Sequence, residues 1–404
     1  MKAEVFAAGF LLVSAGAWFT YAKHTGALNI KGLQNNEQKI VISSDNLYEE
    51  MAYTGKISFT EDETAIAYIS AGGHLKYTKN EQVLEASSDT TGTVNYRFTQ
   101  YGKPLPIDSN ARKLIAEAVS EMIAWGYDAK ERADRIYKKG GQAALLAAMD
   151  KLKNDGTKRM YAERIFKSDS LSAEILVGLS KKLAGPEGND YDKEMILRLY
   201  KPAQLQDTTV LFPYLQAVAQ LDNENARAGI LNNVLKMPLA TASFPALFTV
   251  VTGLNNDYEK TRLFSNILEK GQMDSVRAGL LLEAIDKLQA DHDKEQLISL
   301  WISKGTLPAD RLQQLLSVID RMGGDWEKVN MYKKLVAESI RSEDQWASLV
   351  TMVAHLGQND QKTELLTGIA QRMPKTDSLK AVYMKAAKTI QGDTDYGRAV
   401  RALD

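Results

Sequence analysis

The sequence predicts an α+β protein, in which a small antiparallel β domain precedes an all-α solenoid of helical-hairpin repeats. Three observations predict this architecture. Residues 39–106 alternate in polarity over short stretches, helical periodicity follows from residue 108 to residue 404, and an acidic or amide residue recurs every 34 positions in the last third of the chain. The 404 residues suffice for two or three domains of roughly 150 residues each.

The composition is that of a globular chain and argues against several function classes. Hydrophobic residues make up 44% and charged residues 25%, unlike a disordered or fibrous protein. The 50 Lys and Arg residues balance 51 Asp and Glu residues. A nucleic-acid-binding protein usually has a basic excess, so we expect no nucleic-acid partner. Cysteine is absent, which excludes disulfides, thiolate nucleophiles and cysteine ligands for metals.

Residues 1–22 are predicted to be a signal peptide or an N-terminal anchor. A short apolar run precedes Ala15-Gly16-Ala17, which fits the cleavage pattern of a secretory signal. Cleavage after Ala17 is the preferred interpretation, with Ala22 second. The run is short for a membrane span of about 20 residues, and burying Glu4 in lipid would be costly. An extracytoplasmic location, in the periplasm or envelope, is therefore predicted, and a retained membrane anchor or a cytoplasmic start stays open.

Residues 39–106 are predicted to form the β domain, with one buried face. Residues 64–70 and 74–78 alternate in polarity, and Gly72-Gly73 between them is expected to form a hairpin turn. Short strands at this spacing favour an antiparallel meander. Two polar features of the region are expected to carry no chemistry: His74 is interpreted as an ordinary strand residue, and Glu61-Asp62-Glu63 as a solvated turn.

The helical region from residue 108 to 404 is predicted to be a repeat. The acidic or amide residue recurs at Asp257, Asp291, Asp325, Asn359 and Asp393. Four apolar columns share this register: Leu263, Leu297, Met331 and Leu365; Ile267, Trp301, Leu335, Ile369 and Leu403; Leu281, Leu315, Leu349 and Tyr383; and Leu288, Met322, Leu356 and Ile390. The clearest repeats are therefore 257–290, 291–324, 325–358 and 359–392, and weaker copies begin near residues 154, 189 and 222.

Each copy is predicted to be a pair of antiparallel helices, with the recurring Asp or Asn as the N-cap of the first helix. One hairpin cannot bury its apolar face alone, so the copies must stack into a solenoid of TPR/HEAT-like geometry. The tetratricopeptide signature W-x-x-L-G-x-x-Y is absent from the sequence, so we infer the geometry and not that family. The recurring acids would be spread along the stack, one in each repeat. An active site needs its groups close together, so these acids are not interpreted as one active site.

Tyr258 and Trp326 are the candidate partner-contact residues. Both follow the recurring acid directly, at a variable position where an aromatic side chain is expected to be exposed. Trp301 lies in an apolar column and is predicted to be a core residue. The sequence contains no H-E-x-x-H, G-x-x-x-x-G-K-[ST], G-x-G-x-x-G or G-x-S-x-G motif. We therefore predict no catalytic residue, no cofactor and no metal.

Several stretches resemble a known group of proteins. They are Gly55–Thr60, Ile69–Leu75, Lys130-Glu131-Arg132, Gly140–Leu145 and Asn256–Lys260. Together they resemble an uncharacterised bacterial family of exported proteins, similar to the extracytoplasmic C-terminal region found fused to β-lactam-sensor-type membrane metallopeptidases. The resemblance covers about residues 50–404 and implies an envelope location and a sensing role. The zinc-binding motif of those peptidases has no match in this chain, so the resemblance assigns no catalytic residue.

These observations favour a non-enzymatic extracytoplasmic protein that binds a protein or peptide partner as a scaffold or sensor. Two alternatives stay open. One is an envelope hydrolase with a carboxylate-based site, because 51 acids leave many pairings available. The other is a regulatory subunit of a membrane peptidase, which depends on the resemblance alone.

Overall fold

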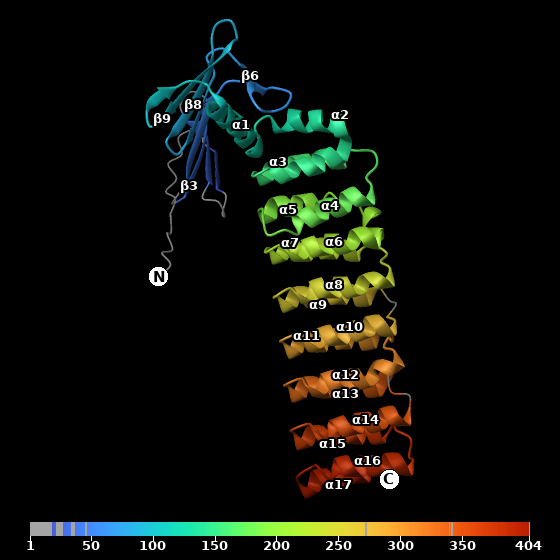
Figure 1. Ribbon diagram of the computed structural model, residues 1–404. Helices are drawn as coiled ribbons and strands as arrows, with labels where there is room; N and C mark the ends of the chain where they lie inside the picture. Colours follow the sequence, from blue (N-terminus) through green and yellow to red (C-terminus); the bar gives the residue numbers. More distant parts are fainter. Residues whose placement is uncertain are drawn as a thin grey trace. The chain divides into compact units, whose positions relative to one another are not determined.

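The predicted fold class is confirmed: an antiparallel β region is followed by an all-α region. The computed structural model describes residues 18–21, 27–33, 37–44, 47–270, 273–338, 340 and 342–403 (Figure 1). The chain forms two compact units. The first extends to Ile136 and includes Ala148–Lys158, and the second comprises Tyr137–Ala147 and Arg159–Asp404.

The first unit contains one large antiparallel sheet with the strand order β1-β2-β3-β4-β7-β8-β9-β10. Its strands are β1 (Trp18–Tyr21), β2 (Ala27–Leu33), β3 (Glu37–Ser44), β4 (Leu47–Thr54), β7 (His74–Lys79), β8 (Gln82–Ser88), β9 (Val94–Gln100) and β10 (Lys103–Leu105). The sheet therefore starts before residue 39, where the sequence placed its beginning. Strand β1 also falls inside the predicted signal segment, and the rest of that segment lies outside the described residues.

The turn at Gly72-Gly73 differs from the predicted hairpin. Strand β6 (Ile66–Ile69) pairs with β5 (Ile57–Phe59) in a separate two-stranded sheet, whereas β7 pairs with β4 and β8. The glycines thus move the chain from one sheet to the other. A Cβ atom at Gly73 would lie 2.8 Å from the carbonyl oxygen of Thr54, so the close approach of strand β4 requires glycine there.

One face of the large sheet is buried by helix α1 (Ser109–Ala124). Met51, Tyr77, Leu84 and Phe98 lie opposite one another across β4, β7, β8 and β9, and each is at most 3% exposed. The apolar stripe of α1, residues Leu114, Ile115, Ala118, Val119 and Met122, belongs to the same core. The sequence assigned α1 to the helical domain because its periodicity is helical, but a sheet with one apolar face must be covered, and α1 covers it.

Helices α2 (Ala129–Ala148) and α3 (Asp155–Phe166) contribute residues to both units. Helix α2 is broken at Gly141, which has φ 64° and ψ −154°. Only glycine adopts this backbone region without strain. The adjacent glycines Gly140 and Gly141 therefore account for the break in this helix.

Replacing Gly141 with alanine is expected to lower the free energy of unfolding by about 1–2 kcal/mol, because the side chain would strain this backbone conformation. Gly368→Ala is the matched control. Gly368 lies inside helix α15 (Asn359–Ala370), and a Cβ atom there would meet no atom within 4 Å. That substitution is expected to stabilise the protein by up to about 1 kcal/mol. Urea unfolding followed by circular dichroism measures both, and equal effects would contradict the assigned break.

The second unit is a stack of helices in two layers. From residue 224 onward each odd-numbered helix contacts the next odd-numbered one, and from residue 173 onward each even-numbered helix contacts the next even-numbered one (Figure 1). The remaining helices are α4 (Ala173–Leu183), α5 (Asp190–Leu197), α6 (Thr208–Ala219), α7 (Glu224–Leu235), α8 (Phe244–Thr252), α9 (Asp257–Glu269), α10 (Ser275–Asp286), α11 (Asp291–Ser303), α12 (Leu312–Asp320), α13 (Asp325–Glu338), α14 (Glu343–Val353), α16 (Asp377–Ala387) and α17 (Asp393–Arg401). Each predicted repeat from residue 257 onward holds one odd-numbered helix and the even-numbered helix after it.

The apolar columns of the repeat form the core of this stack. Every residue of the four predicted columns is buried, and none is more than 8% exposed. Trp301 is 1% exposed, which confirms its predicted place in the core. Since the same positions are buried in each copy, each hairpin covers the apolar face of its neighbour.

The recurring acid does not cap its own helix, which corrects the sequence interpretation. Asp257, Asp291 and Asn359 are the first residues of α9, α11 and α15, and the N-cap positions belong to the residues before them. The side chain instead reaches the loop that precedes the next odd-numbered helix. The backbone N–H groups of Gly323 and Gly324 donate to Oδ2 of Asp291, at 2.7 and 3.0 Å.

The same contact recurs along the stack. Four further bonds have the same geometry: Gln289 N–H donates to Asp257 (2.6 Å), Gly357 N–H to Asp325 (2.8 Å), Gln391 N–H to Asn359 (3.1 Å) and Asn223 N–H to Asp190 (2.7 Å). Lys260 also binds Asp257 within the helix at 2.9 Å. Burial alone would raise the pKa of Asp257, but the bonds from Lys260 and Gln289 hold it below its usual value. The acidic or amide residue that recurs every 34 positions thus joins each repeat to the next.

Candidate functional site

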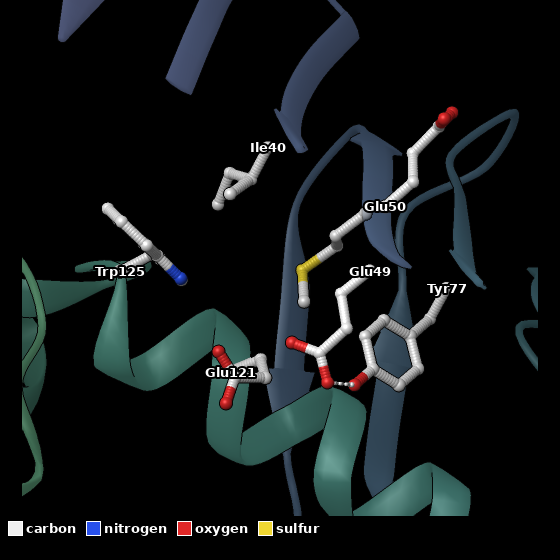
Figure 2. A pocket seen from close by; sticks show the side chains of 7 residues that line it. Ile40, Glu49, Glu50, Tyr77, Glu121 and Trp125 are labelled. Carbon is white, nitrogen blue, oxygen red and sulfur yellow. Dashed lines mark hydrogen bonds between the residues drawn. The ribbon is translucent and has the colours of Figure 1, made fainter. Parts of the chain in front are cut away.

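The first unit has a small hollow between strands β3, β4 and β7 and the end of α1 (Figure 2). Its lining residues are Ile40, Glu49, Glu50, Met51, Tyr77, Glu121 and Trp125. It encloses about 180 Å³ of empty space, part of it open to solvent. Its innermost part has room for about one water molecule, and the whole hollow is smaller than the roughly 300–1,000 Å³ of typical small-molecule sites.

The strands place Glu49 and Tyr77 on the sheet face that α1 covers. Glu49 precedes Met51 by two residues on β4, so both side chains point to one face, and Tyr77 lies opposite Met51. The Tyr77 hydroxyl donates to Oε1 of Glu49 at 3.2 Å, and Nζ of Lys79 lies 3.6 Å from the same oxygen. Burial and the charge of Glu49 raise the pKa of Tyr77, so the phenol stays protonated and remains a donor.

Glu121 and Trp125 complete the hollow from one side of α1. They are four residues apart, which places them one above the other on the helix surface. The carboxylate of Glu121 accepts from Lys153 at 2.7 and 2.8 Å. Trp125 is 8% exposed, and its indole N–H has no hydrogen-bond partner among the described residues. In Figure 2 the indole nitrogen is drawn on the side of the carboxylates.

The hollow has room for about one water molecule or hydroxyl group. A general acid at neutral pH needs a carboxyl group whose pKa is raised. Burial would raise the pKa of Glu50, but hydrogen bonds from Lys39 and Tyr48 lower it below the usual value. Among the described residues, no group of three or more His, Asp or Glu side chains is arranged to hold a metal ion.

Two polar features singled out in the sequence have structural partners. Nδ1 of His74 lies 3.1 Å from the Thr54 hydroxyl on the neighbouring strand. The expected solvated turn at residues 61–63 is only partly correct, because Glu63 accepts two bonds from Arg132, at 2.7 and 2.8 Å. Arg132 is 5% exposed, and its guanidinium lowers the pKa of Glu63. The partner is 69 residues away in sequence, which no local pattern reveals.

The second unit presents a row of exposed aromatic side chains, which we call the aromatic edge. It consists of Tyr191, Tyr258, His292 and Trp326, the second residues of α5, α9, α11 and α13. Tyr191 is 63%, Tyr258 68% and Trp326 62% exposed, and His292 is also exposed. From α7 onward successive odd-numbered helices contact one another, and Asp190 of α5 binds the loop before α7, so equivalent positions lie along one edge of the stack. The sequence singled out Tyr258 and Trp326 and missed Tyr191 and His292.

Carboxylates surround the aromatic edge, and several lysine side chains near it are buried. The first three positions of the odd-numbered helices α5 to α17 contain no Lys or Arg. The acids at those positions are Asp190, Asp192, Glu224, Asp257, Glu259, Asp291, Asp293, Asp325, Glu327, Asp360, Asp393 and Asp395. A Lys often follows at the fourth position, but Lys193, Lys294 and Lys362 are only 6%, 8% and 8% exposed. The accessible surface of the edge is therefore mainly aromatic and acidic, with Arg159 beside Asp192 and Arg262 beside Glu259 as neighbouring cations.

No protein-family model matches the sequence, and none of the curated proteins matches it. None of the described helices combines the length and the apolar character needed to cross a bilayer.

Proposed function

We propose that this protein is a non-enzymatic scaffold or sensor that binds a segment of a partner protein along the aromatic edge. One observation carries the proposal: three large aromatic side chains, each more than 60% exposed, occupy the same position of the repeat. Single exposed aromatic side chains are common on protein surfaces. Here, however, one position of the repeat is aromatic in several copies and is buried in none of them, so these side chains do not serve the core.

The physical properties of the edge favour protein recognition. Tyr and Trp are the residues that most often contribute large binding energies at interfaces, because they bury much area at a low cost in conformational entropy. A stack of repeats presents such side chains at regular intervals, which suits an extended partner better than a compact one. The small hollow of the first unit, in contrast, accommodates about one water molecule, and no observation favours an envelope hydrolase.

The proposed site of action is the periplasm or envelope. The signal pattern at the N-terminus and the resemblance to an exported family support this location. Cleavage after Ala17 would leave β1 (Trp18–Tyr21) and its pairing with β2 whole, whereas cleavage after Ala22 would remove that strand. The sheet thus favours Ala17 as the cleavage position, and the N-terminal mass of the mature protein tests it.

The double substitution Tyr258→Ala/Trp326→Ala is expected to reduce recovery of the bound partner by tenfold or more, because two of the three large exposed aromatic anchors are removed. The measurement is quantitative mass spectrometry of proteins cross-linked to the full chain in intact cells. The matched control is Phe212→Ala/Val276→Ala, which removes two exposed apolar side chains from even-numbered helices of the same unit. Equal recovery with both double variants would overturn the proposed function.

A further inference from the structure

We infer that the aromatic edge binds an extended segment that carries Lys or Arg side chains at regular intervals. This inference rests on the proposed function and adds the chemistry of the partner. Each exposed aromatic ring, together with the carboxylate beside it, would then form a binding site for one cation. We call such a site a cation seat.

The chain itself contains one example of such a seat. The guanidinium of Arg159 lies over the ring of Tyr191, 5.5 Å from the ring centre, and binds Oδ1 of Asp192 at 2.7 Å. A cation over an aromatic face is attracted by the ring quadrupole, and a neighbouring carboxylate adds the attraction of an ion pair. At the first position of the aromatic edge, an aromatic residue and the acid after it therefore already hold an arginine.

Among the described residues, no cation lies over the rings of Tyr258 and Trp326, although Arg262 of α9 pairs with the neighbouring Glu259 at 2.6 Å. Arg159 is the fifth residue of α3, the odd-numbered helix that precedes α5. The fifth residues of α7 and α11, which precede the other two seats, are Ala228 and Glu295. Acids follow both rings directly, as Glu259 and Glu327. The two rings are 68% and 62% exposed, so a cation from a partner can reach them.

The spacing of the repeats sets the spacing of the cations. Packed helices lie about 8–10 Å apart, so Tyr258 and Trp326, two repeats apart, are separated by roughly 20 Å. A polyproline II chain has three residues per turn and rises about 3.1 Å per residue, so it advances about 9 Å per turn. A Lys at every third residue of such a chain would follow the aromatic edge with one cation per repeat.

The test uses the full chain and the fluorescent peptide (Lys-Pro-Ser)5, with binding measured by fluorescence anisotropy at low salt. We expect the dissociation constant to rise at least tenfold for Tyr258→Ala/Trp326→Ala, and to stay unchanged for the control Phe212→Ala/Val276→Ala. The variant Tyr258→Leu/Trp326→Leu keeps apolar area but removes both ring faces. It is expected to lose binding as fully as the alanine variant.

The peptide (Gln-Pro-Ser)5 separates this inference from the proposed function. If the Gln peptide binds as tightly as the Lys peptide, or if the leucine variant keeps full affinity, the edge binds apolar segments and the cation chemistry is wrong. Failure of (Lys-Pro-Ser)5 to bind overturns the inference in every case. The proposed function survives that failure if cross-linking of the cellular partner still depends on Tyr258 and Trp326, and otherwise both are wrong.

Discussion

Trp301→Ala is expected to lower the free energy of unfolding by about 3–5 kcal/mol, the range for deleting a large buried aromatic side chain. Trp301 is 1% exposed and belongs to a column that includes Leu335 and Ile369, each fully buried. The stack cannot close over the lost volume without shifting neighbouring repeats, so a cavity should remain. Urea unfolding monitored at the helical circular dichroism signal measures this change.

Trp301→Phe provides the matched comparison. The indole N–H of Trp301 has no hydrogen-bond partner among the described residues, so phenylalanine removes no bond and leaves a smaller void. We expect a loss of about 1–2 kcal/mol, while Tyr258→Ala on the surface should change stability by no more than about 0.5 kcal/mol. A loss below 1 kcal/mol for Trp301→Ala would contradict the assigned core.

Asp291→Ala is expected to lower the free energy of unfolding by about 2–3 kcal/mol. The substitution removes the acceptor of two backbone N–H groups, those of Gly323 and Gly324, and leaves Lys294, which is 8% exposed, without the carboxylate that lies 3.6 Å from its Nζ. Hydrogen bonds to charged groups contribute about 1.5–3 kcal/mol each, and partial exposure of this loop reduces the sum because water can replace the carboxylate.

Two variants of the same helix control this prediction. Asp293→Ala removes an equal charge from the first turn of α11 and is expected to cost no more than about 1 kcal/mol, the contribution of the helix dipole. Asp291→Asn should restore part of the stability, because Asn359 makes the equivalent contact through its amide oxygen at 3.1 Å. Equal losses for Asp291→Ala and Asp293→Ala would show that the carboxylate acts through the dipole and does not join the repeats.

Much of the second unit could be predicted from the sequence because its information is local and periodic. The apolar columns identified buried residues correctly, since a position that must face the next hairpin is apolar in every copy. The role of the recurring acid was missed for a physical reason. Asp is favoured both at the N-cap and in the first helical turn, and its partner is 32 residues away, as between Asp257 and Gln289.

The first unit was predicted less completely. The alternation of polarity located β6 and β7. The turn at Gly72-Gly73 could not show that these two strands enter different sheets, because strand pairing depends on contacts distant in sequence. The hollow at Glu49 and Trp125 has no sequence signal, because it brings together residues from β4 and α1.

The aromatic edge was found in part. Tyr258 and Trp326 stood out because the repeat register is regular from residue 257 onward. Tyr191 was missed because one interval between earlier copies, from Glu224 to Asp257, is 33 residues and not 34. Its signal was nevertheless present: Asn189-Asp190-Tyr191 repeats the triplet Asn256-Asp257-Tyr258.

Photo-cross-linking from position 292 tests most directly where this protein binds its partner. His292 lies on the aromatic edge between Tyr258 and Trp326, and the exposed Glu283 of α10 provides a comparison position on an even-numbered helix. A photoreactive residue at 292 in intact cells should give a discrete adduct that Tyr258→Ala/Trp326→Ala abolishes, with no such adduct from position 283. An adduct from 283 alone, or an adduct from 292 that persists without the two aromatic side chains, would contradict the proposed binding edge.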